Sequence, residues 1–212
     1  PNHTPSPPQP PTPRTHTPAH GGSALVTNTT GTSNTANGRH ALHSNTIGNA
    51  NTAIGEEALN SNTTGSDNTA TGFQALFHNT SNDITANGFR ALFSNTTGVR
   101  NTAVGFEALL SNTSGGANTA IGDSALASNT ANDNTACGSY ALANNTTGSS
   151  NIATGTDALL LNINGSGNIA DGVDALFHNI SGSGTTANGN RARCNPSGAN
   201  TPAMGSFAGQ HP

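Results

Sequence analysis

Three acidic residues, Asp157, Asp171 and Asp174, come closest in this sequence to a cluster that could carry chemistry. Neighbouring carboxylates could bind Ca²⁺, or they could resemble the acids of a β-helical enzyme that cleaves polysaccharide. The alternative is that they are solvated surface carboxylates, partly offset by Arg191. We favour that alternative, because Arg191 is expected to stack next to Asp174.

The histidines give a weaker metal signal. His40 and His43 form a single pair of imidazoles, and His78 and His178 lie far from each other in the sequence. The chain has no Ser-His-Asp set, no HExxH sequence, no phosphate-binding glycine loop and no calcium-binding nonapeptide. We therefore expect no enzyme activity, no metal site and no cofactor.

Asparagine-linked glycosylation is a further chemistry that the sequence allows, because N-x-S/T sequences recur. The same Asn and Thr are expected in turns for conformational reasons, so the sequence leaves both explanations open. The candidate acceptors are Asn28, Asn62, Asn79, Asn95, Asn112, Asn145 and Asn179.

Two further sets of residues recur at fixed spacing and could form surfaces. An apolar stripe is expected from one rank of Phe73, Phe89 and Phe106 and a second rank of Phe77, Phe93 and Leu110. It is an association surface if both ranks face outward, and the second rank is core if it faces inward. Thr residues form one rank from Thr35 to Thr135 and another from Thr29 to Thr146, and regular threonine ranks suggest binding to ice.

These residues are positioned by an internal repeat of 16 or 17 residues, N-T-A-x-G-x-x-A-L-x-x-N-T-T-G-x-x. We number its positions so that the recurrent glycine is position five. Ala occupies positions three and eight, Leu position nine and Asn position twelve in most copies. The glycines at position five are Gly38, Gly55, Gly72, Gly88, Gly105, Gly122, Gly138, Gly155, Gly172, Gly189 and Gly205.

A repeat of this length with one Leu and two Ala cannot form a helical hairpin, because it has no apolar stripe of 3.6-residue period. Short strands joined by Gly and Asn corners remain. We predict an all-β, single-chain β-solenoid (a β-roll or β-helix) of about 11 coils, with equivalent residues stacked about 4.8 Å apart. Ala at position three and Leu at position nine should point inward, and Ala at position eight should be inward or at a tight corner. Gly at position five and Asn at position twelve should form the corners, where positive φ is tolerated.

The composition agrees with a thin stack and excludes several classes of protein. Charged residues are 8%, aromatic residues 4%, and the net charge is −4, so no basic face for nucleic acid is expected. No apolar run is long enough to span a membrane. Cys137 and Cys194 should lie roughly 14 Å apart along the stack, too far for a disulfide within the chain.

The repeat resembles the head repeats of trimeric autotransporter adhesins, the YadA-like left-handed β-roll. The shared residues are Asn51-Thr52-Ala53-Ile54-Gly55 with Ala58, and Asn118-Thr119-Ala120-Ile121-Gly122 with Ala125. Similar runs look like those of phage tail-fibre and other surface-fibre proteins. The resemblance implies an extracellular or cell-surface location and an adhesive or structural role, with a surface or carbohydrate ligand that the sequence does not identify.

Three regions are expected: a Pro-rich extended arm at residues 1–20, solenoid repeats at 21–209 that become irregular from about 190, and a tail at 210–212. Open solenoid ends invite pairing with another copy, and the arm is expected to lie on a neighbouring subunit. We therefore expect a structural protein that partners with itself, head to tail and also laterally, in a filament or surface fibre. The alternative is an ice-binding solenoid.

Overall fold

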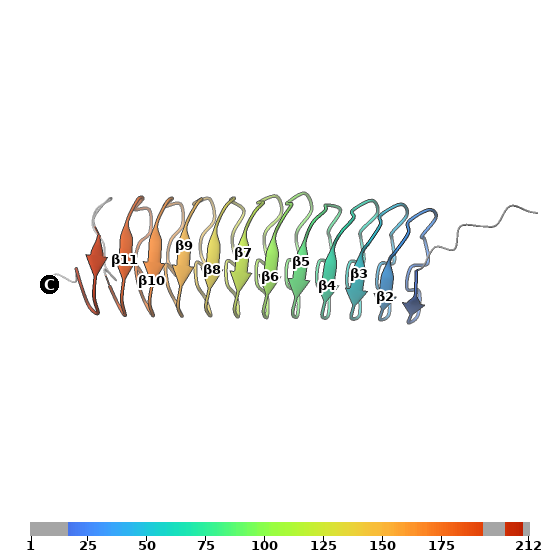
Figure 1. Ribbon diagram of the computed structural model, residues 1–212, viewed down its shortest axis with the longest axis horizontal. Coiled ribbons are helices and arrows are strands. Elements are labelled where there is room, and N and C mark those ends of the chain that lie inside the picture. Colours follow the sequence, from blue (N-terminus) through green and yellow to red (C-terminus); the bar gives the residue numbers. More distant parts are fainter. Residues whose placement is uncertain (1–16, 193–201, 210–212) are drawn as a thin grey trace, which may run out of the picture.

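The computed structural model describes residues 17–192 and 202–209, and these form a single parallel β-solenoid (Figure 1). Its 12 strands lie in one sheet in the order of the sequence, from β1 to β12, with one strand in each coil. The described residues contain no helix. They make about ten complete turns, and part of the eleventh predicted coil, residues 193–201, lies outside the described part of the chain. The predicted fold class is confirmed.

Each strand is short because only positions two to four of the repeat are extended. The strands are β1 (Ala19–His20), β2 (Thr35–Asn37), β3 (Thr52–Ile54), β4 (Thr69–Thr71), β5 (Thr85–Asn87), β6 (Thr102–Val104), β7 (Thr119–Ile121), β8 (Thr135–Cys137), β9 (Ile152–Thr154), β10 (Ile169–Asp171), β11 (Thr186–Asn188) and β12 (Ala203–Met204). Strand β1 falls within the range predicted for the Pro-rich arm. Residues 1–16 of that arm lie outside the described residues.

The strands pair in a register that places identical repeat positions side by side. Ala53 pairs with Ala70, and Ala70 pairs with Ala86 although the coil between them is one residue shorter. The deletion is absorbed in the turn at Asn82 and Asp83, so the alanine frame continues, as the sequence predicts.

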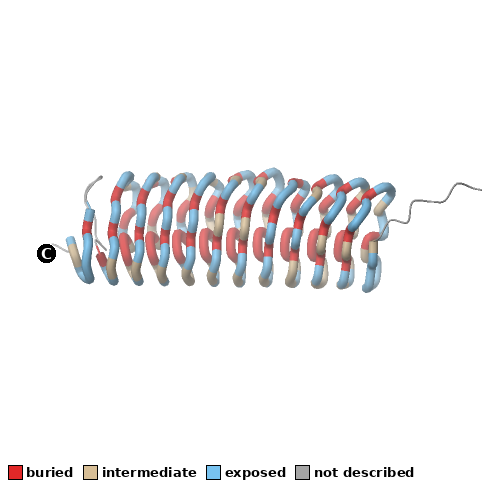
Figure 2. The backbone as a smooth tube through the Cα atoms, viewed as in Figure 1, coloured by how far each residue is buried: buried red, intermediate tan, exposed pale blue. Residues whose placement is uncertain are grey.

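The core is a narrow column of alanine and leucine side chains. In the middle coils, Ala103, Ala108 and Leu109 have no exposed surface, and the same three positions are buried in the neighbouring coils (Figure 2). The predictions for positions three and nine are confirmed. The alternative left open for position eight is resolved, because its alanine points inward.

Two successive turns carry the chain from the strand into the leucine position. The first turn is closed in the coil of β5, where the Ala91 N–H donates to the Gly88 carbonyl, and the second is closed in the coil of β6, where the Leu110 N–H donates to the Glu107 carbonyl. Glu107 and Leu109 consequently have left-handed φ values of 52° and 53°. This conformation strains residues that have a Cβ. The strain is offset because the Glu107 and Leu109 N–H groups bond to the coils on either side, at 2.9 and 3.0 Å, and because Leu109 fills the core.

The prediction for the corner residues is half right. Gly at position five has positive φ, for example 138° at Gly105, where an added Cβ would lie 2.3 Å from the Gly122 carbonyl oxygen. Asn at position twelve does not have positive φ. Its side chain points into the coil instead, where it stabilises the turn through hydrogen bonds rather than through backbone conformation.

Two columns of buried asparagines run along the solenoid, at positions one and twelve. In one coil, Asn151 and Asn162 both donate a side-chain N–H to the Gly165 carbonyl, at 2.8 and 2.9 Å. Each also donates to an asparagine of the preceding coil, Asn134 at 3.2 Å and Asn145 at 2.7 Å respectively. The stacking of Asn at position twelve is as predicted. The second column, at position one, was not predicted.

Each internal 16-residue coil interrupts the column at position twelve. The Oδ1 atoms of Asn62 and Asn112 are buried and have no hydrogen-bond partner, although most of the column is satisfied. The asparagines that follow them, Asn79 and Asn129, donate instead to their own shortened turns at Ser81 and Ala131. Loss of one turn residue therefore preserves the apolar core and removes one rung of the polar column.

Candidate interaction surfaces

The acidic residues do not form a metal site among the described residues, where no group of three His, Cys, Asp or Glu side chains could hold an ion. Asp157 and Asp174 occupy the same position in adjacent coils. Partial burial raises the pKa of Asp157, and the negative charge of Asp174 raises it further. Asp174 accepts a hydrogen bond from Arg191 Nε at 3.1 Å, and Asp171 accepts one from Asn188 at 3.3 Å. These are contacts between coils.

The histidines make contacts both within a coil and between neighbouring coils. The rings of His40 and His43 lie 5.1 Å apart and are tilted by 57°. His43 Nδ1 lies 3.2 Å from the Ser23 carbonyl oxygen. The ring of His78 makes edge contacts with Phe77 and Phe93, with centroids 4.7 and 5.0 Å apart.

The asparagines of the N-x-S/T sequences belong to the buried column at position twelve. Six of the seven have side chains that are at most 2% exposed, and Asn28 in the first coil is half-buried. The Nδ2 atom, to which a glycan would be attached, donates hydrogen bonds inside the wall, as in Asn112 to Asn95 and to Gly115 at 3.0 and 2.9 Å. The geometry favours the structural explanation of these sequences, because a glycan on the folded chain would displace both bonds. The six are Asn62, Asn79, Asn95, Asn112, Asn145 and Asn179.

The predicted apolar stripe lies on the outside of the solenoid. Phe73, Phe89 and Phe106 are 39, 40 and 48% exposed and stack in order, with centroids 5.5 and 5.1 Å apart and nearly parallel rings. The second rank, Phe77, Phe93 and Leu110, is half-buried and is not part of the core. Its two phenylalanines also stack, at 5.3 Å. The second rank is therefore not core, and association through the stripe stays a prediction.

Stacking restricts what the stripe can bind. The ring faces are turned toward one another along the solenoid, so a ligand meets mainly ring edges. The Arg90 guanidinium lies 4.5 Å over the Phe93 ring and also bonds Glu107 at 3.1 Å, which fixes the second rank from the side. The stripe is thus a preformed apolar ridge rather than a set of open aromatic platforms.

A second exposed surface is the outer face of the sheet. Because side chains alternate along a strand, positions two and four point outward when Ala at position three points inward. Position two is mostly Thr, and position four includes Ile54, Val104 and Ile121. Asp171 is the single charged side chain at these two positions from β2 to β11. Apart from Asp171 the face is therefore uncharged, and it is regular and rich in β-branched residues; the exposed free thiol of Cys137 lies on it.

The two threonine ranks differ in what their hydroxyls do. At position thirteen, hydroxyls bond to the next coil, as in Thr96 to the Thr113 carbonyl at 2.8 Å and Thr130 to the Thr146 carbonyl at 2.9 Å. At position two, from Thr35 to Thr135, no hydroxyl bonds to any described residue. Only the rank on the sheet face therefore has all its hydroxyls available to water or to a ligand.

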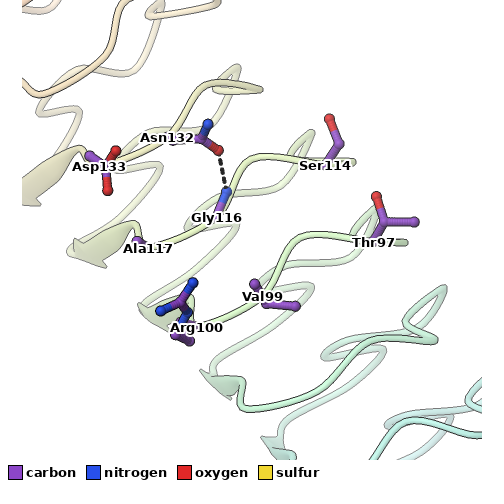
Figure 3. Close-up of a pocket in the computed structure, with 8 residues that line it drawn as sticks. All are labelled: Thr97, Val99, Arg100, Ser114, Gly116, Ala117, Asn132 and Asp133. Atoms are coloured by element: carbon purple, nitrogen blue, oxygen red, sulfur yellow. Dashed lines mark hydrogen bonds between the residues drawn. The ribbon is translucent and has the colours of Figure 1, made fainter.

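A shallow groove of about 290 Å³ lies at the corners of three coils (Figure 3). Arg100 and Asp133 line it, and the Gly116 N–H donates to Asn132 at 2.7 Å at one side. The groove adjoins the shortened turn at Asn132 and Asp133. It holds one exposed base and one exposed acid, and no nucleophile is paired with a base in it.

The two ends of the sheet carry unpaired backbone groups. Inside the solenoid, the N–H groups of positions three, five and seven donate to carbonyls of the preceding coil, as Gly38 does to His20 at 2.7 Å. In the first coil, the equivalent N–H groups of Ala19, Gly21 and Ser23 have no partner among the described residues. At the other end, the carbonyls of positions two, four and six lack a donor from the described residues; they belong to Pro202, Met204 and Ser206.

No helix in the described part of the chain is long and apolar enough to cross a membrane. Comparisons of this chain with protein-family models, with curated proteins and with solved structures give no match.

Proposed function

We propose that this chain is a structural subunit of an extracellular filament or surface fibre, and that its subunits join head to tail. The observation that carries the proposal is the complementarity of the two solenoid ends. The first coil presents unpaired N–H donors at positions three, five and seven. The last described coil presents unpaired carbonyls at positions two, four and six, which are the acceptors that these donors use throughout the solenoid.

The complementarity has a direction. A second copy translated along the axis would place its Ala19, Gly21 and Ser23 N–H groups against the carbonyls of Pro202, Met204 and Ser206. The first coil also exposes carbonyls, at Ala24 and Val26, because N–H groups at positions nine and eleven donate to the following coil, as Leu42 does to Ala58. Two identical ends brought together would run round the coil in opposite senses, so they could not continue the parallel register of the solenoid. A contact between unlike ends produces an open filament when it does not close into a ring. Added strands also gain affinity from main-chain hydrogen bonds, as in other cases of β-augmentation.

Lateral association through the aromatic stripe would be weak for a single pair of subunits. Phe73, Phe89 and Phe106, at 39–48% exposure, offer roughly 300 Å² together. A stable interface needs about 800 Å² from each partner. The contact becomes useful only when many subunits lie in register along two filaments, because linked weak contacts then add. The stripe therefore suits bundling of filaments and not dimerisation of free subunits.

The composition, the hydrogen bonds between coils and the repeat motif support a structural role. The chain is low in charge and aromatic residues, and its side-chain hydrogen bonds mostly link one coil to the next. Its N-T-A-x-G-x-x-A repeat also resembles adhesin head and surface-fibre repeats, which is our reason for proposing an extracellular or cell-surface location. The Pro-rich arm would extend the contact between subunits.

Replacing Ala19 with proline tests the proposed joint. Proline removes one outward N–H and adds a ring at the open edge, where it is tolerated because no strand of the described residues pairs on that side of β1. We expect the variant to remain folded and to lose most of its assembly, measured by sedimentation velocity at rising concentration.

Val26→Ser in the same coil is the matched control, because Val26 is exposed on the side of the solenoid. It should assemble like the unaltered chain. The joint is wrong if Ala19→Pro assembles equally well while circular dichroism shows intact β-structure.

Ice binding is a second candidate function, and the sheet face is the observation that favours it. Threonine hydroxyls and methyls repeat at the coil spacing of about 4.8 Å on a face whose single charged side chain from β2 to β11 is Asp171, and these hydroxyls bond to none of the described residues. The partner rank on this face is position four, not the rank from Thr29 to Thr146. Position four is mixed, with Asn and Asp among its residues, so the face is less regular than paired threonine ranks would be.

Changing Thr85, Thr102 and Thr119 together to lysine tests this candidate. The long charged side chains would keep ice from the face without entering the core, so inhibition of ice recrystallisation should fall to background. The matched control is Thr64, Thr97 and Thr147 to lysine, because these exposed threonines lie at the corner. Ice binding is excluded if the unaltered chain shows no inhibition, or if both triple variants retain it.

A further inference from the structure

Four Asn-Gly dipeptides occur in the sequence, and the fold places them in two different environments. Asparagine followed by glycine is the sequence most prone to deamidation, because glycine leaves the backbone nitrogen open to attack on the side-chain amide. Whether attack occurs in a folded chain depends on the freedom of that nitrogen and of the asparagine side chain. The four are Asn37-Gly38, Asn87-Gly88, Asn164-Gly165 and Asn188-Gly189.

Three of them are held in the sheet. Each of these asparagines is the last residue of a strand, β2, β5 or β11. The N–H of the glycine that follows donates to the preceding coil, at 2.7 Å for Gly38, 2.8 Å for Gly88 and 2.7 Å for Gly189. The attacking nitrogen is therefore engaged, and it becomes available only when the sheet opens locally.

The fourth lies in the corner between strands. Asn164 is exposed, and its side-chain amide bonds to none of the described residues. Its backbone N–H makes one long bond, 3.4 Å, to the Ile180 carbonyl. The Gly165 N–H has no hydrogen-bond partner in the described part of the chain. Both reacting groups are thus free of the hydrogen bonds that restrain the other three pairs.

We infer that Asn164 is a site of spontaneous deamidation, and that this reaction opens the wall of the solenoid at one coil. The Gly165 nitrogen attacks Cγ of Asn164, a new C–N bond forms, and Nδ2 leaves as ammonia with the proton from the attacking nitrogen. Water then hydrolyses the cyclic imide at one of its two carbonyls. One product is aspartate, and the other is isoaspartate, in which the backbone runs through the former side chain.

The isoaspartate product acts on both asparagine columns. It adds one carbon to the backbone directly before Gly165, whose carbonyl accepts bonds from Asn151 and Asn162 at 2.8 and 2.9 Å. Gly165 has little room to adjust, because its Cα lies in a crowded corner where an added Cβ would be 2.3 Å from the Gly182 carbonyl oxygen. A shift of the carbonyl would therefore leave two buried amide groups without their acceptor, which weakens this coil.

The test is incubation of the full chain at physiological temperature and mildly alkaline pH, followed by peptide mapping with mass spectrometry that distinguishes isoaspartate. Asn164 should deamidate at least about tenfold faster than Asn37, Asn87 or Asn188, because the last three require loss of a ladder hydrogen bond. In chemically denatured chain the four rates should become similar.

Two variants connect the chemistry with the structure. Asn164→Thr should remove the modification and keep the fold, because Thr97 and Thr147 occupy the same position in other coils. Asn164→Asp carries the added charge without the extra backbone atom, so it should melt like the unaltered chain while the isoaspartate fraction melts lower. Equal rates at all four sites in the folded chain, an unmodified Asn164, or the same rate difference after denaturation would each overturn the inference.

Discussion

Leu109→Asp should lower the free energy of unfolding by about 5 kcal/mol or more, because truncation of a buried leucine and burial of a carboxylate act together. Leu109 is fully buried in the middle of the column, between Leu92 and Leu126. A solenoid is stabilised mainly by contacts between adjacent repeats. The loss of packing should therefore spread to the neighbouring coils and divide the stack into two shorter folded segments. Chemical denaturation followed by circular dichroism measures the change.

The matched control is Ser111→Asp, two residues further along the same coil. Ser111 is exposed and its backbone N–H bonds to the Ala127 carbonyl, a bond that the substitution leaves in place. It should change stability by no more than about 0.5 kcal/mol. Equal effects of the two changes would show that position nine is not the core.

Gly105→Ala should be the second most damaging change, although it adds only one methyl group. The new Cβ would lie 2.3 Å from the Gly122 carbonyl oxygen and 2.6 Å from its carbon, and both atoms belong to the backbone of the next coil. Neither can move without stretching the ladder. Gly105 also has a φ of 138°, which residues with a Cβ rarely adopt. We expect a loss of roughly 4 kcal/mol in the same denaturation assay.

Gly205→Ala separates the two causes. Gly205 occupies the same position in the last described coil and has a φ of 109°, but a Cβ there meets no described atom within 4 Å. Only the conformational strain remains, so the loss should be about 1–3 kcal/mol. If Gly205→Ala is as harmful as Gly105→Ala, close stacking of coils is not what requires glycine at this position.

The repeat made the fold predictable because each copy carries the same few signals. Ala at position three and Leu at position nine recur at a spacing that no helix can bury, and they occupy the inside of the coil as expected. Gly at position five has the positive φ that its chemistry suggests. The two short coils also behave as predicted for the core, because a deletion in a turn leaves the strand register unchanged.

Other features could not be derived from residue types. Left-handed φ at Leu109 and Glu107 runs against their intrinsic preference, and it arises because the neighbouring coils fix their N–H groups. The buried asparagines escaped prediction at position one, since a polar residue usually suggests the surface. The sequence did contain an indication of the second column, because Asn recurs at position one in most coils although no turn there requires it. The outward direction of Phe77 and Phe93 likewise depends on turn geometry and not on hydrophobicity.

The candidate surfaces were predictable as sets of residues and not as geometry. The sequence places Phe73, Phe89 and Phe106 in one rank, but their parallel stacking follows from the actual coil spacing. The threonine rank on the sheet face was found, while its partner at position four was missed because those residues vary in type. The pairing of donors at one end with acceptors at the other needs the direction of each backbone group, which no sequence pattern gives.

Electron microscopy of the full chain at high concentration tests the central claim, end-to-end assembly, most directly. One subunit, with its 12 stacked strands, is a rod of about 50 Å at about 4.8 Å per strand. The account predicts unbranched filaments many subunits long, single or bundled side by side, in which the strand spacing continues across each joint. Separate rods of single-subunit length under the same conditions would contradict it.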